Sequence, residues 1–306
     1  TLSSSSAASD VYKRQAQDIM NSGAEQCGIA AIAPRNPQRL DRGLTDHDLL
    51  TLGVTSHADG HTDFGVIASI SEGLAYRRDD DFRRITEIAC AESLQLITLT
   101  ITEKGYQLNG YDGSYQDAVV KDLGRDPESD RMSTAMGLVT ALLVQRFHAG
   151  ATPVAVVSCD NFSHNGDMLR TSVLTIAAEW EKRGVIDHRV VEWIAEKVEF
   201  PISVIDKITP APSQKVAEQL AEMGLEDMAI DPDVEVAGFV NTEPAEYLVI
   251  EDRFPNGRPE LEKAGVYFTE RDTCYRFERM KVTTCLNPLH TALAITGVLL
   301  RKPTID

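Results

Sequence analysis

Apolar runs of strand length alternate with longer amphipathic stretches through the first two thirds of the chain. Three runs are mostly apolar and of strand length, 27–33, 94–102 and 154–157, and we expect them to be buried strands of a parallel sheet. Segments with helical spacing of apolar positions lie between and beyond them, at 16–22, 79–92, 132–148, 167–183 and 188–197. This alternation predicts an α/β fold built on a doubly wound parallel sheet.

Two further strands, 49–54 and 64–70, are predicted to form an antiparallel pair around a glycine-containing loop. The loop carries His57 and His61. Four residues apart on a helix, two histidines would face one metal ion, but in a hairpin loop we expect them to face solvent.

The pattern changes after about residue 200. A proline-punctuated connection leads to a polar helical stretch at 211–228, a strand-like stretch at 234–250 and a long helical run at 277–300. We therefore predict two domains, the first over residues 16–205 and the second over residues 206–306.

The first fifteen residues differ in composition from everything that follows. They are serine-rich, and their last part, DVYKRQ, is what the transposon-end sequencing adaptor GAT-GTG-TAT-AAG-AGA-CAG encodes in frame. We interpret residues 1–15 as an adaptor-derived, non-native tail and expect native sequence from about Ala16. A natural disordered tail is the alternative.

Composition and charge narrow the class of function. The hydrophobic fraction of 42% and the charged fraction of 25% are ordinary for a globular protein. The formal net charge is −17 and no basic cluster interrupts it, which argues against a nucleic-acid partner and against an anionic membrane. The negative net charge does not exclude a small anionic substrate, because a single Arg or Lys can bind it.

The cysteines and the apolar runs indicate the compartment. Five cysteines without a CxxC pair favour reduced thiols in a cytoplasm over a disulfide framework. No apolar run approaches the roughly 20 residues of a membrane span, and the N-terminus lacks the apolar core of a signal peptide. We expect a cytoplasmic protein.

Polar side chains follow two of the predicted parallel strands at the point where each strand ends. Ser158, Asp160 and Asn161 come after the run 154–157, and Glu103 with Lys104 comes after the run 94–102. The carboxyl ends of parallel strands form the ligand crevice of open α/β sheets. By itself, a polar turn between strand and helix explains the first group equally well.

Two other groups were weighed as ligands. The acidic ribose ligand of a dinucleotide fold would stand after the strand 27–33, where Arg35 offers a contact for a 2′-phosphate or is simply an exposed turn residue. Cys159 and His164 would need a distant third ligand to bind zinc, and a buried cysteine is usually a small apolar residue. We expect no metal.

Five blocks of sequence resemble the mannitol dehydrogenase family of long-chain polyol and sugar-acid dehydrogenases. They occur in the family's order and together span most of the chain: ITEKGY (101–106), SCDNFSHNG (158–166), IDKITP (205–210), VIEDRFPNGRPELEKAGV (249–266) and KVTTCLNPLH (281–290). The resemblance implies a Rossmann-type nucleotide-binding domain, truncated at its N-terminus, followed by the start of a mostly helical catalytic domain, truncated at its C-terminus.

The resemblance also implies a chemistry and a set of site residues. The family transfers a hydride, without a metal, between a nicotinamide cofactor and a secondary alcohol or ketone of an open-chain sugar derivative. By resemblance the catalytic residues are Lys281 as acid/base, Asn161 and Asn287 as donors to the reacting oxygen, and His290. Glu103, Asp206 and Glu278 resemble the family's charged residues around the substrate pocket. From its position at a strand end we add Lys104 as substrate-binding, and by the same argument we predict cofactor contacts at Arg35, Ser158, Asp160 and Asn161.

The chemistry suits these residue types. Alcohol oxidation needs a base for the hydroxyl proton, and a base works best when its pKa is near the operating pH. Burial against an apolar helix would lower a lysine pKa, whereas a nearby carboxylate such as Glu278 would raise it, so the sequence leaves the sign open. Neutral amides such as Asn161 and Asn287 donate to a developing oxyanion without adding a titrating charge.

The chain departs from the family's pattern in three places. The glycine-rich phosphate loop and the first strand are absent, so we expect this chain to bind the cofactor poorly and to be inactive by itself. Lys281 to Asn287 is one residue longer than the family's spacing, which on an unbroken helix would turn Lys281 by about 100°. A bulge or a helix start must therefore lie between them. The third departure is the end at Asp306, before most of the helical domain.

Three functions follow from the resemblance. The variants CLNPLHTALA and EKGYQLNGYDG favour a branch that interconverts D-mannonate and D-fructuronate with NAD, with NADP as the alternative cofactor. A mannitol 2-dehydrogenase acting on mannitol and fructose is the second possibility. A non-catalytic sugar-binding relative is the third, and the complete set Lys281, Asn161, Asn287 and His290 counts against it.

Overall fold

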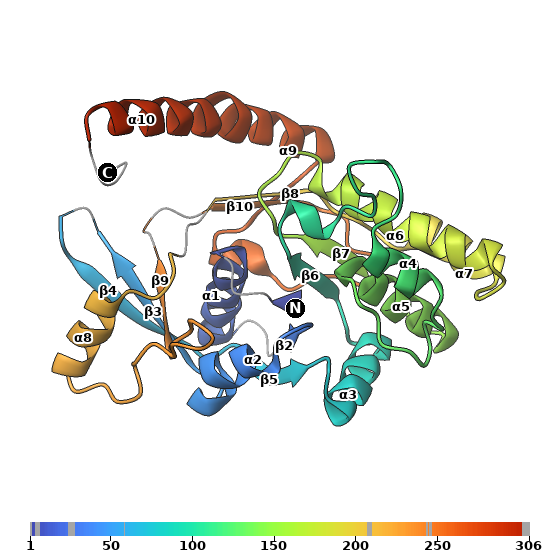
Figure 1. Ribbon diagram of the computed structural model, residues 1–306, viewed down its shortest axis with the longest axis horizontal. Helices are drawn as coiled ribbons and strands as arrows, with labels where there is room; N and C mark the ends of the chain where they lie inside the picture. The colour runs from blue at the N-terminus through green and yellow to red at the C-terminus, as the bar shows by residue number, and fades with distance from the viewer. Residues whose placement is uncertain are drawn as a thin grey trace.

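A five-stranded parallel sheet forms the centre of the molecule (Figure 1). The computed structural model describes residues 2–3, 7–23, 28–57, 59–206, 210–242, 244 and 247–301. The sheet has the order β5 (Ile70–Ala75), β2 (Ile29–Ala33), β1 (Leu2–Ser3), β6 (Leu96–Thr100) and β7 (Ala155–Ser158). Numbered within this sheet alone, the strands run 3-2-1-4-5, the order of a doubly wound dinucleotide fold. The predicted fold class is confirmed.

Helices cover one face of this sheet. They are α3 (Asp79–Cys90), α5 (Ala135–His148) and α6 (Asn165–Lys182), with α4 (Asp117–Leu123) and α7 (His188–Lys197) beside them. Their apolar side chains share a core with alternate residues of the strands, such as Leu99 and Val156. Trp180 and Leu143 are fully buried in this core.

The other face is covered by helix α1 (Ala7–Ser22) and a second sheet. That sheet has the order β11 (Tyr267–Thr269), β10 (Tyr247–Glu251) and β8 (Ser203–Asp206), with the turn Leu261–Ala264 packed on α1. Val157 points into this second core while its neighbour Val156 points into the first. Both faces of the parallel sheet are therefore buried, which explains the mostly apolar runs of its strands.

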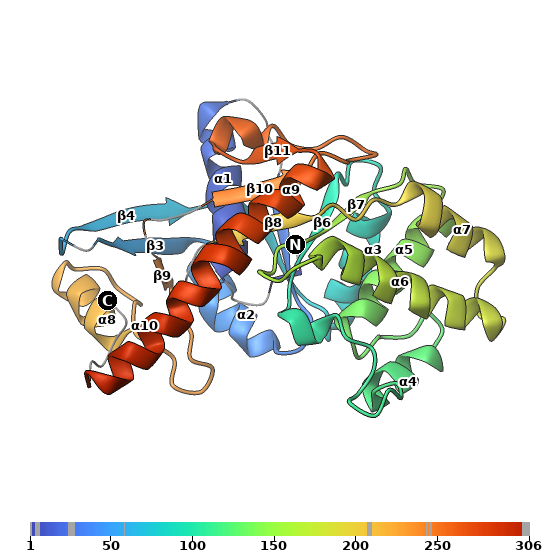
Figure 2. The ribbon, with the colours of Figure 1, turned by 90° about the horizontal axis from the view of Figure 1, so that it is seen from above.

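A third, smaller sheet carries the predicted antiparallel pair. β3 (Thr51–Ser56) and β4 (Thr62–Ile67) form the hairpin, and β9 (Phe239–Thr242) adds to β3 in parallel. Helix α8 (Gln214–Glu222) packs on this sheet, and this side of the molecule projects from the body in Figure 2. Helix α2 (Pro37–Gly43) packs instead on β2 and β5 of the central sheet. β9 follows the predicted domain boundary at residues 205/206 in the sequence but pairs with β3, which precedes it. β8 (Ser203–Asp206) contains the boundary itself. The division into two domains stays a prediction.

The N-terminal expectations need correction in two respects. The first strand was expected to be missing, but Leu2–Ser3 pairs in parallel with both β2 and β6 and fills its place. The first helix begins at Ala7, nine residues before the predicted start, and buries Ile19 at 1% exposure. Backbone hydrogen bonding along a strand does not depend on side chains, so a serine-rich pair can occupy this position.

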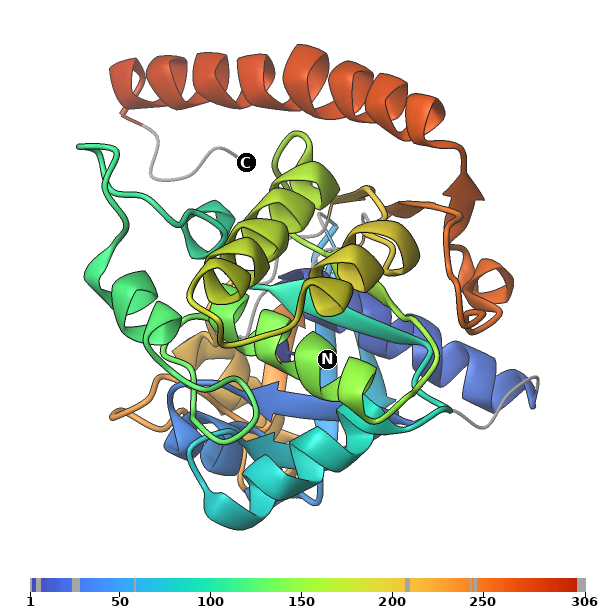
Figure 3. The ribbon, with the colours of Figure 1, turned by 90° about the vertical axis from the view of Figure 1, so that its right-hand side faces the viewer.

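The chain ends in a long, continuous helical stretch, which we call the C-terminal helix. It comprises α9 (Arg271–Glu278), a π-helical segment (Arg279–Leu286) and α10 (Asn287–Leu299). No residue of α10 is buried, and Figure 3 shows it running across the top of the molecule.

By length and mean hydropathy, 1.3 over its most apolar window, the stretch Arg271–Leu299 could cross a membrane. The expectation that no segment reaches that threshold was therefore wrong, because the helix continues through polar positions that interrupt the apolar run. One such helix is weak evidence for a membrane.

Candidate functional site

The turn after β7 is fixed by a buried carboxylate. Asp160 accepts hydrogen bonds from the backbone N–H of Ile101 at 2.8 Å and of Thr102 at 3.0 Å, and from the hydroxyl of Tyr106 at 2.6 Å. The same Tyr106 hydroxyl lies 2.7 Å from Ser158 Oγ. Burial and the neighbouring Asp160 charge raise the pKa of Tyr106, which keeps it a neutral donor. Asp160 therefore joins the carboxyl ends of β6 and β7.

Backbone strain marks both strand ends. Thr102 after β6 has φ of 65° and His164 after β7 has φ of 59°, in the left-handed region. For a β-branched residue such as Thr102 this conformation is a clear outlier, and such strain gathers at functional sites. Thr102 precedes the short 3₁₀ turn that presents Glu103 and Lys104, both exposed.

Asn165 and Gly166 connect the turn after β7 to the second sheet. The buried Asn165 amide donates to Asp160 O at 3.0 Å and to Ser203 O at 2.9 Å, and its oxygen accepts from Ser203 N at 3.2 Å. A Cβ on Gly166 would lie 2.6 Å from the carbonyl oxygen of Phe200. Only glycine allows this close approach. Sequence reasoning missed both roles, although the Asn-Gly pair at the helix start was a visible signal.

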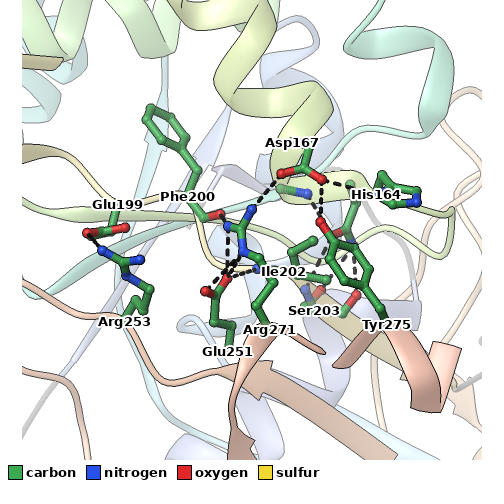
Figure 4. A network of polar contacts seen from close by, with 12 residues as sticks. His164, Asp167, Glu199, Phe200, Ile202, Ser203, Glu251, Arg253, Arg271 and Tyr275 are labelled. Atoms are coloured by element: carbon green, nitrogen blue, oxygen red, sulfur yellow. Dashed lines mark hydrogen bonds and ion pairs between the residues drawn. The ribbon is translucent and has the colours of Figure 1, made fainter. Parts of the chain in front are cut away.

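A charged network docks the C-terminal helix onto α6 (Figure 4). Arg271 Nη1 lies 2.6 Å from Asp167 Oδ1, and its Nε lies 3.0 Å from the carboxylate of Glu251. The Tyr275 hydroxyl donates to Asp167 at 2.5 Å, and His164 Nδ1 lies 3.1 Å from the same carboxylate. The network thus spans α6, β10 and α9.

The electrostatics of the network favour its charged form. Burial works to raise the pKa of Asp167, but hydrogen bonds from Tyr275, His164 and Arg271 prevail and lower it. The hydrogen bond to Glu251 raises the pKa of Arg271. Glu251 is 3% exposed, whereas the Arg271 side chain is 35% exposed, so only the carboxylate side of this pair is shielded from solvent.

Lys281 lies over an aromatic ring on the second sheet. Its Nζ is 5.2 Å from the ring centroid of Tyr247, and that ring packs edge-on against Phe277 at 5.2 Å. Tyr247 and Asp206 are paired across the ladder between β8 and β10. Burial raises the pKa of Asp206, and the Lys281 charge and the neighbouring Tyr247 hydroxyl oppose this rise. Burial and the Asp206 charge raise the pKa of Tyr247 to about 12.

Glu278 connects the Lys281 helix to the turn after β7. It accepts a hydrogen bond from Ser163 Oγ at 2.7 Å and one from Thr283 Oγ1 at 3.0 Å. Ser163 stands two residues after Asn161. The structure therefore gathers Glu278, Lys281 and Asp206 beside the strand-end turn.

The predicted irregularity between Lys281 and Asn287 is confirmed. Residues 279–286 form a π-helix, whose hydrogen bonds close from i to i+5 and which holds about one more residue per turn than an α-helix. The extra residue of the chain is absorbed there. A π-helix turns less per residue than an α-helix, so it reduces the rotation of about 100° that an unbroken α-helix would impose.

Other predicted residues lie at the rim. Asn161, Asn287 and His290 are exposed, the last two on α10, and their convergence with Lys281 stays a prediction. Arg35 is exposed after β2. Ser158 and Asp160 are buried and bonded as described, so they shape the crevice edge, and their direct contact with a cofactor also stays a prediction.

The residues weighed as metal ligands have other partners. Cys159 is buried in the second core, where burial raises its pKa to about 12, and His164 bonds to Asp167. His57 and His61 both contact Asp63, at 2.7 and 2.9 Å. Within the described part of the chain, no group of three or more His, Cys, Asp or Glu could hold a metal ion.

Comparisons with known proteins agree on one family. The model of the mannitol dehydrogenase Rossmann domain matches residues 22–263. The D-mannonate oxidoreductase of Thermotoga maritima is 45% identical over 290 residues, which is 93% of this chain and 53% of that protein.

Two solved structures are also similar. A mannitol 2-dehydrogenase of Pseudomonas fluorescens, in ternary complex with NAD and D-mannitol, has a TM-score of 0.75 and 31% identity over 94% of this chain and 55% of its own. A substrate-free D-sorbitol dehydrogenase has a TM-score of 0.77 and 27% identity over 94% and 56%. The chain thus spans about half the length of the relatives that it matches.

Proposed function

The chain belongs to the mannitol dehydrogenase family, and on that premise we propose that the protein is a nicotinamide-dependent oxidoreductase of a sugar acid. It would interconvert D-mannonate and D-fructuronate, the reaction of a mannonate oxidoreductase. The similarity to the Thermotoga protein carries this proposal, since 45% identity extends over 93% of the chain.

The strand order of the central sheet is compatible with a dinucleotide cofactor, but the sequence before α1 lacks the glycine of a phosphate-binding turn. β1 lies between β2 and β6, so the sheet has the switch point where such cofactors bind. Asn161 and Arg35 are exposed after β7 and β2, and we propose them as cofactor contacts. The first glycine of the chain is Gly23, so no glycine-rich turn precedes α1 to hold a pyrophosphate.

NAD is the proposed cofactor, with NADP as the alternative because of Arg35. The bound cofactor would supply the hydride acceptor or donor.

The protein's own residues would manage the proton and the oxygen. Lys281 would take the hydroxyl proton during oxidation and return it during reduction. Asn161 and Asn287 would donate hydrogen bonds to the developing alkoxide, and His290 would hold a neighbouring substrate oxygen. The contacts of Lys281 with Tyr247, and of Glu278 with Ser163, support a site between the turn after β7 and the C-terminal helix.

Further residues would bind the substrate. Glu103 and Lys104 stand after β6, and Asp206 with Glu278 lies beside Lys281. An exposed ammonium such as that of Lys104 suits a carboxylate substrate.

Comparing rates on D-fructuronate and D-fructose with NADH tests the proposal in the full-length protein. A clear preference for fructuronate is expected. Preference for fructose would establish the alternative, a mannitol 2-dehydrogenase. No turnover of either, with intact fold and cofactor binding, would favour a non-catalytic sugar-binding protein.

A cytoplasmic location and a small-molecule partner complete the proposal. The net charge of −17 supports neither a nucleic-acid nor an anionic membrane partner. The four cysteines that the structure describes are free thiols, as expected of a reducing compartment.

A further inference from the structure

Lys281 has a partner that its position in the chain does not reveal. Lys281 lies on the π segment and is exposed, with a flexible side chain. Its ammonium is 5.2 Å from the ring centroid of Tyr247, within the range of a cation–π contact.

Tyr247 is itself held in place from two sides. Phe277 packs edge-on against its ring, and β8 with Asp206 flanks it on the neighbouring strand. Asp206 and Tyr247 are directly paired in the ladder between β8 and β10, which fixes the spacing of their backbones. The ring therefore offers Lys281 a rigid surface at a defined place.

The titratable groups around Lys281 come from three elements. Asp206 stands on β8, Tyr247 on β10, and Glu278 on α9, close before Lys281 on the same helix. Glu278 is engaged by Ser163 and Thr283. Among these groups, Tyr247 is the one whose contact with the ammonium is geometrically defined.

We propose that Tyr247 is a positioning residue for the acid/base Lys281, holding its ammonium by the ring face. The assignment rests on the proposed function for its catalytic meaning, but the contact itself does not. A ring face attracts the ammonium and not the neutral amine, so the contact depends on the charge of the side chain.

Amine labelling of the 306-residue chain tests the contact without activity. Lys281 acetylation by acetic anhydride, followed by peptide mass spectrometry at fixed pH, reports the fraction of neutral amine. Tyr247→Leu should raise the labelling rate of Lys281 by about two- to fivefold. Tyr247→Phe keeps the ring and should change it less than about twofold. Tyr247→Trp, with the stronger ring, should lower it.

Controls separate this effect from local unfolding. Tyr267→Leu removes an exposed aromatic residue from neighbouring β11 and should leave Lys281 labelling unchanged. Lys182, on α6 and 78% exposed, provides an internal reference rate in every variant. Equal Lys281 rates in the Leu, Phe and Trp variants would overturn the proposal. If the Leu variant does not fold, the Phe and Trp rates still decide.

The pH dependence of the full-length protein tests the catalytic meaning. For alcohol oxidation, the acid limb of kcat/KM should move to lower pH in Tyr247→Leu, because the ammonium loses its contact with the ring. Tyr247→Phe should restore the limb. Lower kcat with an unmoved limb would show a merely structural role. If Lys281→Ala retains turnover while the labelling series behaves as expected, the proposed function fails and the contact stands.

Discussion

The turn after β7 and helix α10 carry the two halves of the candidate site, and they are held in opposite ways. The turn is tied to β6 through Asp160, to β8 through Asn165 and to α9 through Asp167. None of α10 is buried, although it carries Asn287 and His290. The turn after β7 is therefore held rigidly by its own hydrogen bonds. The positions of Asn287 and His290 depend on the helix α10 that carries them.

The contacts on the two sides therefore have different roles: those of the turn fix its geometry, and the π segment orients α10. Buried polar networks fix geometry when every member is satisfied, which is the case for the Asp160 carboxylate. On the other half, orientation depends on the π segment between Lys281 and Asn287. The comparison predicts large functional effects on both halves but large stability effects on the turn alone.

Removal of Lys281 should have the largest effect. In the full-length protein, Lys281→Ala should lower kcat by about 10² to 10⁴-fold, because a general acid/base contributes that much. Cofactor affinity should be nearly unchanged, since Lys281 is proposed to act on the proton alone. Steady-state kinetics and NADH fluorescence titration measure the two, and a loss below tenfold would count against the assignment.

Removal of the two amides should test whether the halves act together. Asn161→Ala and Asn287→Ala should each lower kcat by about 10² to 10³-fold, as for other oxyanion donors. The double variant should lose much less than the product, because residues that act as a unit are non-additive. Multiplicative losses in properly folded variants would show that the two amides do not share one oxygen.

The sequence predicted the strands around the turn after β7 better than it predicted the hydrogen bonds of that turn. Apolar runs indicated β2, β6 and β7, because strands buried on both faces are continuously apolar. β5 was missed, since its Ser71, Glu72 and Gly73 interrupt the run. The π segment could be inferred because an added residue must be absorbed somewhere along a helix.

The tertiary partners could not be predicted. Arg271 and Asp167 are 104 residues apart, and no local pattern pairs them. Tyr247 had the signature of an ordinary strand residue. Asp160 was predicted to contact a cofactor from its strand-end position, and its hydrogen bonds to backbone N–H groups and to Tyr106 could not be predicted in the same way. Such contacts depend on how strands and helices dock, which their periodicity does not encode.

Substitution of Gly166, after β7, and of Gly297, on α10, should show which half of the site contributes to the stability of the fold. Gly166→Ala forces a Cβ to 2.6 Å from Phe200 O and should destabilise by about 1–3 kcal/mol, as overpacking does. Gly297→Ala in α10 meets no atom within 4 Å and should not destabilise, since alanine favours a helix by about 0.5–1 kcal/mol. Urea unfolding of the chain measures both midpoints. Equal losses would mean that α10 is packed as tightly as the turn.

The smallest expected effect concerns the pH dependence of the docking network. The pKa of Asp167 is lowered in the folded state, so its contribution to stability is present above the unfolded value of about 3.9 and is lost as pH falls below it. Asp167→Asn should therefore reduce the loss of stability between pH 6 and pH 3. We expect this change in the pH dependence of stability to be small, because Asp167 is 39% exposed and water screens its interaction with Arg271.

Asp112→Asn is the matched control for this measurement. The pKa of Asp112 is also lowered, by the hydroxyl and backbone N–H of Ser114, but these contacts stay within one exposed turn. The test compares urea midpoints at pH 6 and pH 3 for the wild type and both variants. A pH slope altered by Asp167→Asn more than by Asp112→Asn would show that ionised Asp167 joins α9 to α6. Identical slopes would mean that Arg271 holds the C-terminal helix through Glu251 alone, and the turn after β7 would then be less firmly tied to Lys281 than its contacts indicate.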